Sequence, residues 1–214
     1  MTKPDITLYH APMARSVRVR WGLEEMGLPY TLENFGPITA DVRGNLGGEP
    51  FKAINPIQKV PAMTDGDTVI LESMAMLDYI GHRYGPTNLI VTPEEDDYAR
   101  YLEWFQFGEA TMSISVNMVM AHTVLLPEAH RQPGIAKWAA YMVSEQLGLI
   151  GSRGLEDGQR EFLAGDRLTF ADMSVAYMLY LLKITRNFGD APDSVSAYFN
   201  RIKALPSWQA ATAD

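Results

Sequence analysis

The feature that constrains this chain most is a proline-containing stretch, Asn55-Pro56-Ile57-Gln58-Lys59-Val60-Pro61-Ala62-Met63. Proline has no backbone N–H, so Pro61 at the start of a strand leaves part of that strand's edge outside the sheet ladder. X-Pro bonds are also the ones that adopt the cis form at low cost, and a cis Val60-Pro61 bond turns the Val60 N–H and C=O outward, side by side. The stretch therefore predicts a strand edge that is available for binding.

A hairpin and a helix follow this stretch. Asp65-Gly66 is a tight-turn signal between strands predicted at residues 60–63 and 69–71. Glu72-Ser73 then opens a helix to about residue 84, with Ser73 as a good N-cap residue and no capping box, because Met76 stands three residues later. Since a helix N-terminus favours anions, we expect the Ser73 hydroxyl and the first free N–H groups to take a carboxylate or phosphate.

The motif NPxxKVPA, followed by a DG turn and by ES at a helix start, resembles the glutathione-binding half of a protein of the cytosolic (soluble) glutathione S-transferase family, of bacterial type. In that family the residue before the proline pairs its backbone with the cysteinyl unit of glutathione, and the Glu-Ser pair holds the γ-glutamyl end. The resemblance implies glutathione as cosubstrate. It assigns glutathione binding to Lys59, Val60, Pro61, Glu72 and Ser73. Each residue alone has a simpler explanation as a cap or turn former, so their order along the chain carries the resemblance.

The composition excludes several classes of function. The chain has 214 residues and 47% apolar content, which suffices for one large or two small domains. A formal charge of -8, with a pI near 5.0, argues against nucleic acid as a partner. No apolar stretch reaches membrane-spanning length and no signal peptide is recognised, so we expect no membrane partner and a cytoplasmic location.

Cysteine and histidine usage limits the chemistry. The absence of cysteine excludes disulfides, thiolate metal sites and a protein thiol nucleophile. The four histidines show no metal-ligand spacing, so we expect no metal.

The order of predicted elements indicates two domains. Strand, helix, strand, loose helix, hairpin and helix over residues 1–85 is the order of a thioredoxin-like α/β domain. After a linker, residues 93–214 show only helical periodicity, with long helices at 98–123 and 133–154 and a final helix near 194–204. Together these are an α/β thioredoxin-like N-terminal domain and an all-α C-terminal domain, the glutathione transferase fold that the resemblance implies. In that fold the helical domain forms the electrophile pocket.

A second specific signal lies in the helical domain. Thr169 as N-cap and Asp172 at the third helical position predict a capping box, the N-capping motif that the family uses in folding. We assign no chemistry to Asp172.

The reaction that the resemblance implies is activation of the glutathione thiol. A free thiol titrates near 8.5, so holding thiolate at neutral pH requires lowering the thiol pKa by about 1.5 to 2 units, or roughly 2 to 3 kcal/mol. Two features suffice. They are the positive end of the helix that starts near Arg15, and a hydroxyl or cation hydrogen-bonded to the sulfur.

The sequence departs from the familiar catalytic patterns of the family. Ala14 stands at the position of a catalytic serine, and Arg15 at that of the bacterial cysteine. Met13-Ala14-Arg15 replaces the Ser-Ser-Cys of the maleylacetoacetate isomerase class, which argues against that activity. A mixed disulfide with glutathione is excluded because the chain has no cysteine.

Three candidates remain for the catalytic group. Arg15 resembles the cationic position of a cyanobacterial class, Ser16 is the nearest hydroxyl, and Tyr9 ends the first strand where other classes use tyrosine. The simpler explanations are an ion pair for Arg15, an N-cap for Ser16 and a half-buried core position for Tyr9.

Two functions remain open at this point. The first is a glutathione S-transferase, a detoxification enzyme that adds the thiolate to a small hydrophobic electrophile. The second is a catalytically silent glutathione-binding or protein-interaction module of the same fold, which Ala14 favours. The resemblance also implies a two-fold homodimer.

Overall fold

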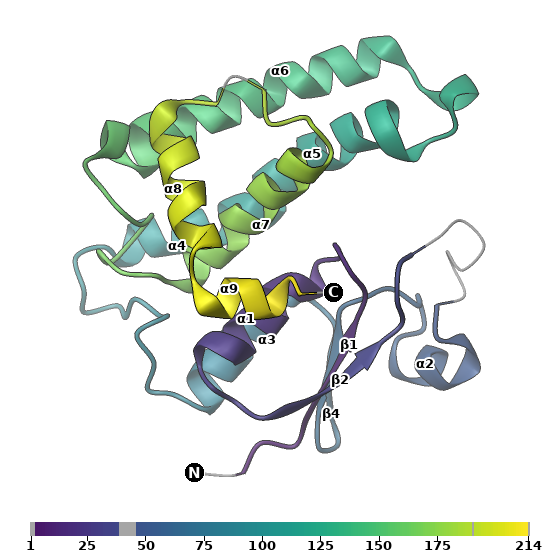
Figure 1. Cartoon of the computed structure of the whole chain (residues 1–214). Helices are drawn as coiled ribbons and strands as arrows, with labels where there is room; N and C mark the ends of the chain where they lie inside the picture. Colours follow the sequence, from purple (N-terminus) through teal and green to yellow (C-terminus); the bar gives the residue numbers. More distant parts are fainter. Residues whose placement is uncertain (1–2, 39–45, 190, 214) are drawn as a thin grey trace. The chain divides into compact units, whose positions relative to one another are not determined.

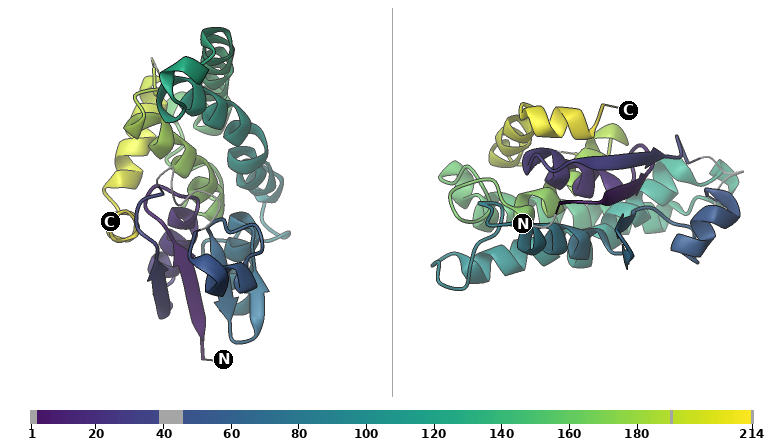
Figure 2. Two further views of the ribbon diagram at one scale, coloured as in Figure 1. Left: turned by 90° about the vertical axis from the view of Figure 1, so that its right-hand side faces the viewer. Right: turned by 90° about the horizontal axis from the view of Figure 1, so that it is seen from below.

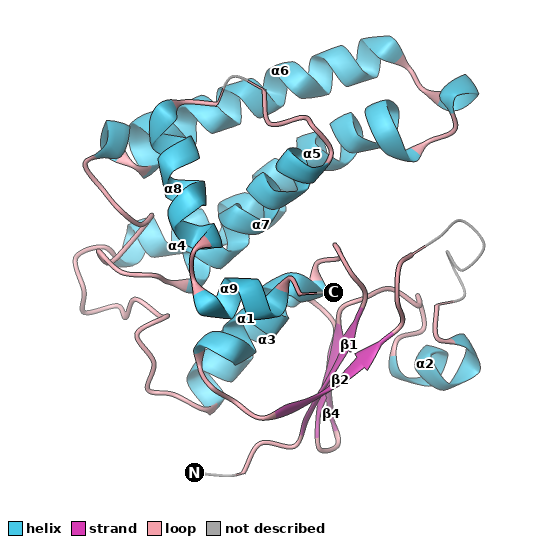
Figure 3. Ribbon diagram, in the orientation of Figure 1, coloured by secondary structure: helices cyan, strands magenta, loops and turns pink. Residues whose placement is uncertain are grey.

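The computed structural model describes residues 3–38, 46–189 and 191–213. Its contacts divide the chain into two units, residues 1–87 with 205–214 and residues 88–204. In the described part of the chain, all strands belong to the first unit and the second unit is helical (Figure 3). This confirms the expected fold class.

The first unit is built on a four-stranded mixed sheet in the order β2-β1-β3-β4. β1 (Ile6–His10) lies parallel to β2 (Tyr30–Asn34) and antiparallel to β3 (Ala62–Asp65). β3 pairs antiparallel with β4 (Thr68–Ile70) across the predicted tight turn. A parallel pair needs a crossover connection, and α1 (Ser16–Glu25) supplies it between β1 and β2.

Helices lie on both sides of this sheet. α1 and α3 (Ser73–Arg83) cover one face, and α2 (Gly48–Ile54) lies on the other side (Figure 1). The side chains of β1 alternate accordingly: Ile6, Leu8 and His10 are buried, and Thr7 and Tyr9 between them are half-buried. The loose helix that the sequence predicts between the second strand and the hairpin thus exists as α2.

The end of the chain returns to the first unit. α9 (Pro206–Ala211) lies along α1 (Figure 2), where the rings of Trp208 and Trp21 meet edge to face with centroids 4.9 Å apart. The Trp21 indole N–H donates to Ser207 Oγ at 3.0 Å. Residues 205–214, which the sequence groups with the helical domain, therefore belong to the first unit because an aromatic pair and a hydrogen bond anchor them there.

The second unit is a set of helices in which α-helical segments are continued by π-helical ones. These are α4 (Tyr98–Gln106), η1 (Phe107–Met112), α5 (Ser113–Met120), η2 (Ala121–Leu125), the short η3 (Glu128–His130), α6 (Pro133–Leu149), η4 (Ile150–Gly154), the short η5 (Glu156–Gly158), α7 (Phe170–Ile184) and α8 (Asp193–Lys203). The long helix predicted over 98–123 is the continuous run α4-η1-α5-η2. At Gly108 a Cβ would stand 2.3 Å from the Ser174 carbonyl oxygen, so only glycine permits this close approach of η1 to α7.

The capping box at the start of α7 is confirmed. The Asp172 carboxylate accepts hydrogen bonds from the Thr169 N–H at 2.8 Å, the Leu163 N–H at 2.9 Å and the Tyr198 hydroxyl at 3.0 Å. Complete burial nevertheless outweighs these donors and raises the pKa of Asp172 to about 6. Asp172 thus ties the N-terminus of α7 to the preceding loop and to α8.

Among the described helices, none combines the length and the apolar character that a membrane span requires.

Candidate functional site

The connection between β1 and α1 places two of the predicted catalytic residues. Arg15 is the N-cap residue of α1 and is partly exposed, so the residue lies at the positive end of the helix. Ser16 is 0% exposed, and its hydroxyl donates to the Ala11 carbonyl at 3.3 Å. The Ser16 Oγ atom also accepts from the Ala11 N–H at 3.4 Å. The Ser16 hydroxyl therefore ties the first residue of α1 to Ala11, at the start of the loop between β1 and α1.

Tyr9, the third candidate, projects toward α2. Its ring centroid lies 5.1 Å from that of Phe51 and 6.2 Å from that of Phe35. Tyr9 packs with these rings against a small core cluster that includes Leu46 and Ala62. Its ring is therefore a half-buried part of the packing between the sheet and α2.

The stretch before Pro61 is a closed turn. The Asn55 side chain donates from Nδ2 to the Lys59 carbonyl at 2.6 Å and accepts from the Ile57 N–H at 3.2 Å. The Gln58 side chain donates from Nε2 to the carbonyls of Leu46 and Gly48, each at 3.2 Å. Two buried amides thus fix the turn internally and attach it to the start of α2.

The turn ends at the predicted strand edge. The Val60-Pro61 bond is cis, and the ladder between β1 and β3 has its last register pair at Tyr9 and Ala62. If the antiparallel register between β1 and β3 is extended beyond this last pair, Val60 lies beside the loop that leads into α1. Lys59 is exposed, and Val60 is half-buried next to it.

The N-terminus of α3 differs in one detail from the expectation. Glu72, not Ser73, is the N-cap residue, with φ -92° and ψ 128°, and its carbonyl accepts the first helical hydrogen bond from the Met76 N–H at 2.8 Å. Ser73 is consequently the first residue with helical geometry. The extended backbone of Glu72 explains the shift, since the chain turns into the helix only after it. The N–H groups of Ser73, Met74 and Ala75 have no carbonyl one turn earlier in the helix to bind.

A buried arginine joins α1 to this helix end. Arg18, in the first turn of α1, is 0% exposed, and its Nη1 lies 3.4 Å from Ser73 Oγ. Together with the β1–β3 register, this contact brings the start of α1, the Val60 edge and the N-terminus of α3 to the same end of the sheet.

The other end of α3 is held by a carboxylate. Asp65 Oδ2 accepts from the hydroxyls of Tyr79 at 2.8 Å and Tyr84 at 2.5 Å. Burial raises the pKa of Asp65, but the two hydroxyls and the Asp5 backbone N–H outweigh it and hold that pKa below its ordinary value. The hairpin thereby fixes the direction of α3.

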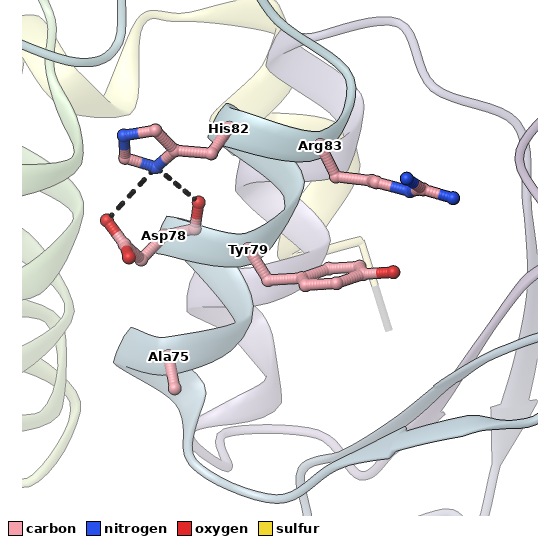
Figure 4. Close-up of a pocket in the computed structure, with 5 residues that line it drawn as sticks. All are labelled: Ala75, Asp78, Tyr79, His82 and Arg83. Carbon is pink, nitrogen blue, oxygen red and sulfur yellow. Dashed lines mark hydrogen bonds and ion pairs between the residues drawn. The ribbon is translucent and has the colours of Figure 1, made fainter. Parts of the chain in front are cut away.

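A hollow lies on the outer face of α3 (Figure 4) and is lined by Ala75, Asp78, Tyr79, His82 and Arg83. His82 Nδ1 lies 3.4 Å from an Asp78 carboxylate oxygen, and both side chains are exposed. The residues that line this hollow run along α3 from Ala75 to Arg83 and do not include Ser73, the first residue of the helix.

Acidic and histidine side chains do not gather anywhere into a metal site within the ranges 3–38, 46–189 and 191–213.

Comparison with known proteins decides the family. The protein-family model described as "Glutathione S-transferase, N-terminal domain" matches residues 4–82 of the sequence. The family model described as "Glutathione S-transferase, C-terminal domain" matches residues 128–210. A glutathione S-transferase of Hyoscyamus muticus is 31% identical over 203 residues, which cover 91% of this chain and 91% of the relative. The chain belongs to the glutathione S-transferase family.

Solved structures of glutathione S-transferases share the fold over the whole chain. A glutathione transferase from Methylococcus capsulatus str. Bath superposes with a TM-score of 0.80 at 26% identity and 97% coverage of both chains. Ure2p5 of Phanerochaete chrysosporium, cocrystallized with 1-(S-glutathionyl)-2,4-dinitrobenzene, has a TM-score of 0.78 at 22% identity, covering 100% of this chain and 95% of its own.

Sequence reasoning did not single out three supporting residues of the candidate site: Asn55, Gln58 and Arg18. Asn before proline is a side-chain-to-backbone turn signal, so the role of Asn55 was open to prediction. Gln58 and Arg18 act on partners that are distant in sequence, and only the fold brings those partners near.

Proposed function

We propose that the protein is a glutathione transferase that activates the glutathione thiol for attack on a small apolar electrophile. The observation that carries the proposal is that three parts meet at one end of the sheet. They are the strand edge at Val60, the Ser73 end of α3 and the Arg15 end of α1. Each part suits one portion of a tripeptide thiol that bears a carboxylate at its γ-glutamyl end.

Glutathione binding is divided between two elements in this proposal. The Val60 backbone pairs with the cysteinyl unit, with Pro61 and the exposed Lys59 beside it. Ser73 and the first N–H groups of α3 bind the γ-glutamyl carboxylate, because a helix N-terminus stabilises an anion, and Glu72 binds the γ-glutamyl amine. The conjugate held by Ure2p5 supports glutathione as the ligand class.

Arg15 is our first choice for the activating group. It is the N-cap residue of α1, and a cation lowers the pKa of a thiol more than the neutral hydroxyls of Ser16 and Tyr9 do. A cation and a helix N-terminus both favour the thiolate over the thiol. Ser16 and Tyr9 remain the alternatives that mutagenesis has to separate.

The reaction transfers an alkyl or aryl group to sulfur. With an alkyl or aryl halide, the thiol proton leaves to solvent, the thiolate sulfur forms a bond to the electrophilic carbon, and the bond from that carbon to the halide breaks. The halide is the leaving group and departs with the bonding electron pair. With an isothiocyanate the thiolate adds to the central carbon, and the nitrogen takes up a proton, so nothing leaves. No step needs an oxidant or a metal.

The second candidate function is a silent glutathione-binding module, which Ala14 favours because it replaces a hydroxyl. Glutathione-dependent turnover of aryl halides, isothiocyanates and peroxides separates the two. Turnover of an aryl halide or an isothiocyanate above the uncatalysed rate supports the transferase, whereas turnover of peroxides alone would oxidise glutathione to its disulfide without any group transfer. Glutathione binding by calorimetry without turnover of any of them supports the silent module.

We also propose a two-fold homodimer. The hollow on α3 carries an acid, Asp78, and two basic residues, His82 and Arg83 (Figure 4). A two-fold axis beside this face would bring the acid of one copy near the bases of the other, so the face complements itself.

A further inference from the structure

Arg18 has an unusual place for an arginine. Its side chain is 0% exposed, although arginine is among the residues least often found inside proteins. The Nη1 atom lies 3.4 Å from Ser73 Oγ, 55 positions later in the sequence. Ser73 itself is 3% exposed, so its neighbours rather than solvent set the direction of its hydroxyl.

The chemistry of this contact fixes which atom donates. A guanidinium stays protonated in proteins and can only donate, so the Ser73 oxygen must be the acceptor. The Ser73 O–H then has to point away from Arg18. Inside a helix a serine hydroxyl often bonds the carbonyl four residues earlier, but Ser73 is the first helical residue and has no such helical carbonyl.

We propose that Arg18 is a positioning residue for the γ-glutamyl carboxylate of glutathione: it holds Ser73 Oγ from inside the unit and turns the Ser73 O–H toward a carboxylate bound at the N-terminus of α3. This inference rests on the proposed function. In it, the Ser73 hydroxyl joins the N–H groups of the first helical turn as a donor to the anion. The Arg18 charge lies directly behind the hydroxyl and polarises it further.

Direct binding measurements test this role without relying on activity. Calorimetry gives the Kd of glutathione for the wild type, Arg18→Met, Ser73→Ala and the double variant. The same titrations use γ-aminobutyryl-cysteinyl-glycine, which lacks only the α-carboxylate of the glutamyl unit. Arg20→Met is the matched control, because Arg20 is an arginine of the same helix whose side chain contacts Tyr30 instead of Ser73.

We expect Arg18→Met to weaken glutathione binding about tenfold or more, and Arg20→Met to change it less than threefold. Binding of the analogue should change less than threefold in Arg18→Met. In the Ser73→Ala background, Arg18→Met should add less than threefold, because Arg18 acts through Ser73. Arg18→Lys, which keeps a cation but loses the fork, should recover part of the affinity.

Four outcomes overturn the proposal. They are unchanged glutathione affinity in Arg18→Met, an equal loss for glutathione and the analogue, full additivity with Ser73→Ala, and failure of both Arg18→Met and Arg18→Lys to fold. The last would make Arg18 a structural residue. If the wild type itself does not bind glutathione, the proposed function fails and the role of Arg18 with it. If the wild type binds and only Ser73→Ala weakens binding, the role of Arg18 alone fails.

Discussion

Asn55 Nδ2 donates to the Lys59 carbonyl oxygen at 2.6 Å, so a buried amide closes the turn that precedes Val60. Asn55 Oδ1 accepts from the Ile57 N–H in the same turn. The strand edge at Val60 therefore takes its position from a side chain that need not touch a ligand.

Asn55→Ala should loosen this edge. The substitution removes two part-buried hydrogen bonds and the buried amide that makes them, so we expect a loss of about 1–3 kcal/mol in the free energy of unfolding. The Kd of glutathione should rise about three- to tenfold as the Val60 backbone loses its fixed position. Urea unfolding and calorimetry measure the two effects.

Asn34→Ala is the control for this prediction. Asn34 Oδ1 also accepts from a backbone N–H two residues on, that of Gly36 at 2.9 Å, but at the exposed end of β2. The Asn34→Ala substitution should change the free energy of unfolding by less than about 1 kcal/mol and leave the Kd of glutathione unchanged. Equal effects of the two variants would show that the Asn55 turn does not organise the binding edge.

Ser73→Ala should affect binding more than chemistry. The γ-glutamyl end is far from the reacting sulfur, so its contacts stabilise substrate and transition state alike. The KM for glutathione should rise about tenfold while kcat stays within about threefold. Ser152→Ala, which removes an exposed hydroxyl in η4, is the control and should change neither. A large fall in kcat at unchanged KM would place Ser73 at the sulfur instead.

The capping box gives the helical unit a specific pH dependence. The folded pKa of Asp172, about 6, lies above the ordinary value of 3.8, so protonation favours the folded state. This contribution is fully present below about pH 4 and is lost as the pH rises through 6. The difference in unfolding free energy between the wild type and Asp172→Asn should shift in favour of the wild type by about 1 kcal/mol from pH 7 to pH 5.

Urea unfolding of both proteins at the two pH values measures this shift. Asp166→Asn is the control, because Asp166 is an exposed acid of the loop that precedes α7. A shift of the opposite sign would mean that the hydrogen bonds from Thr169, Leu163 and Tyr198 outweigh the burial of the carboxylate.

The sequence predicted the parts of the fold that local patterns encode. The hairpin at Asp65-Gly66, the α7 capping box and the glutathione S-transferase family all followed from residues that are close in sequence. The cap of α3 was wrong by one residue, because the preference of serine for N-caps did not reveal the extended backbone of Glu72. The docking of α9 on Trp21 and the contact from Arg18 to Ser73 join distant segments, so they needed the tertiary structure.

The dimer proposal predicts both a mass and a surface. Sedimentation at micromolar concentration should give twice the chain mass of 23.9 kDa. Asp78→Lys should weaken the dimer, because it places like charges on the face that carries His82 and Arg83. Asp67→Lys, on the exposed hairpin turn, should leave it intact. A wild-type monomer would contradict the dimer, and an unaffected Asp78→Lys dimer would contradict the face.

The central claim is that the bound thiol is held as a thiolate next to Arg15. Ultraviolet titration of glutathione bound to the wild type, Arg15→Ala, Ser16→Ala and Tyr9→Phe measures this directly. We predict a thiolate band at pH 7 in the wild type and a thiol pKa that is about one to two units higher in Arg15→Ala than in the wild type, with turnover lowered roughly ten- to a hundredfold. A wild type that binds glutathione without any thiolate at pH 7 would contradict the claim, and a pKa that moves only in Tyr9→Phe or Ser16→Ala would contradict the choice of Arg15.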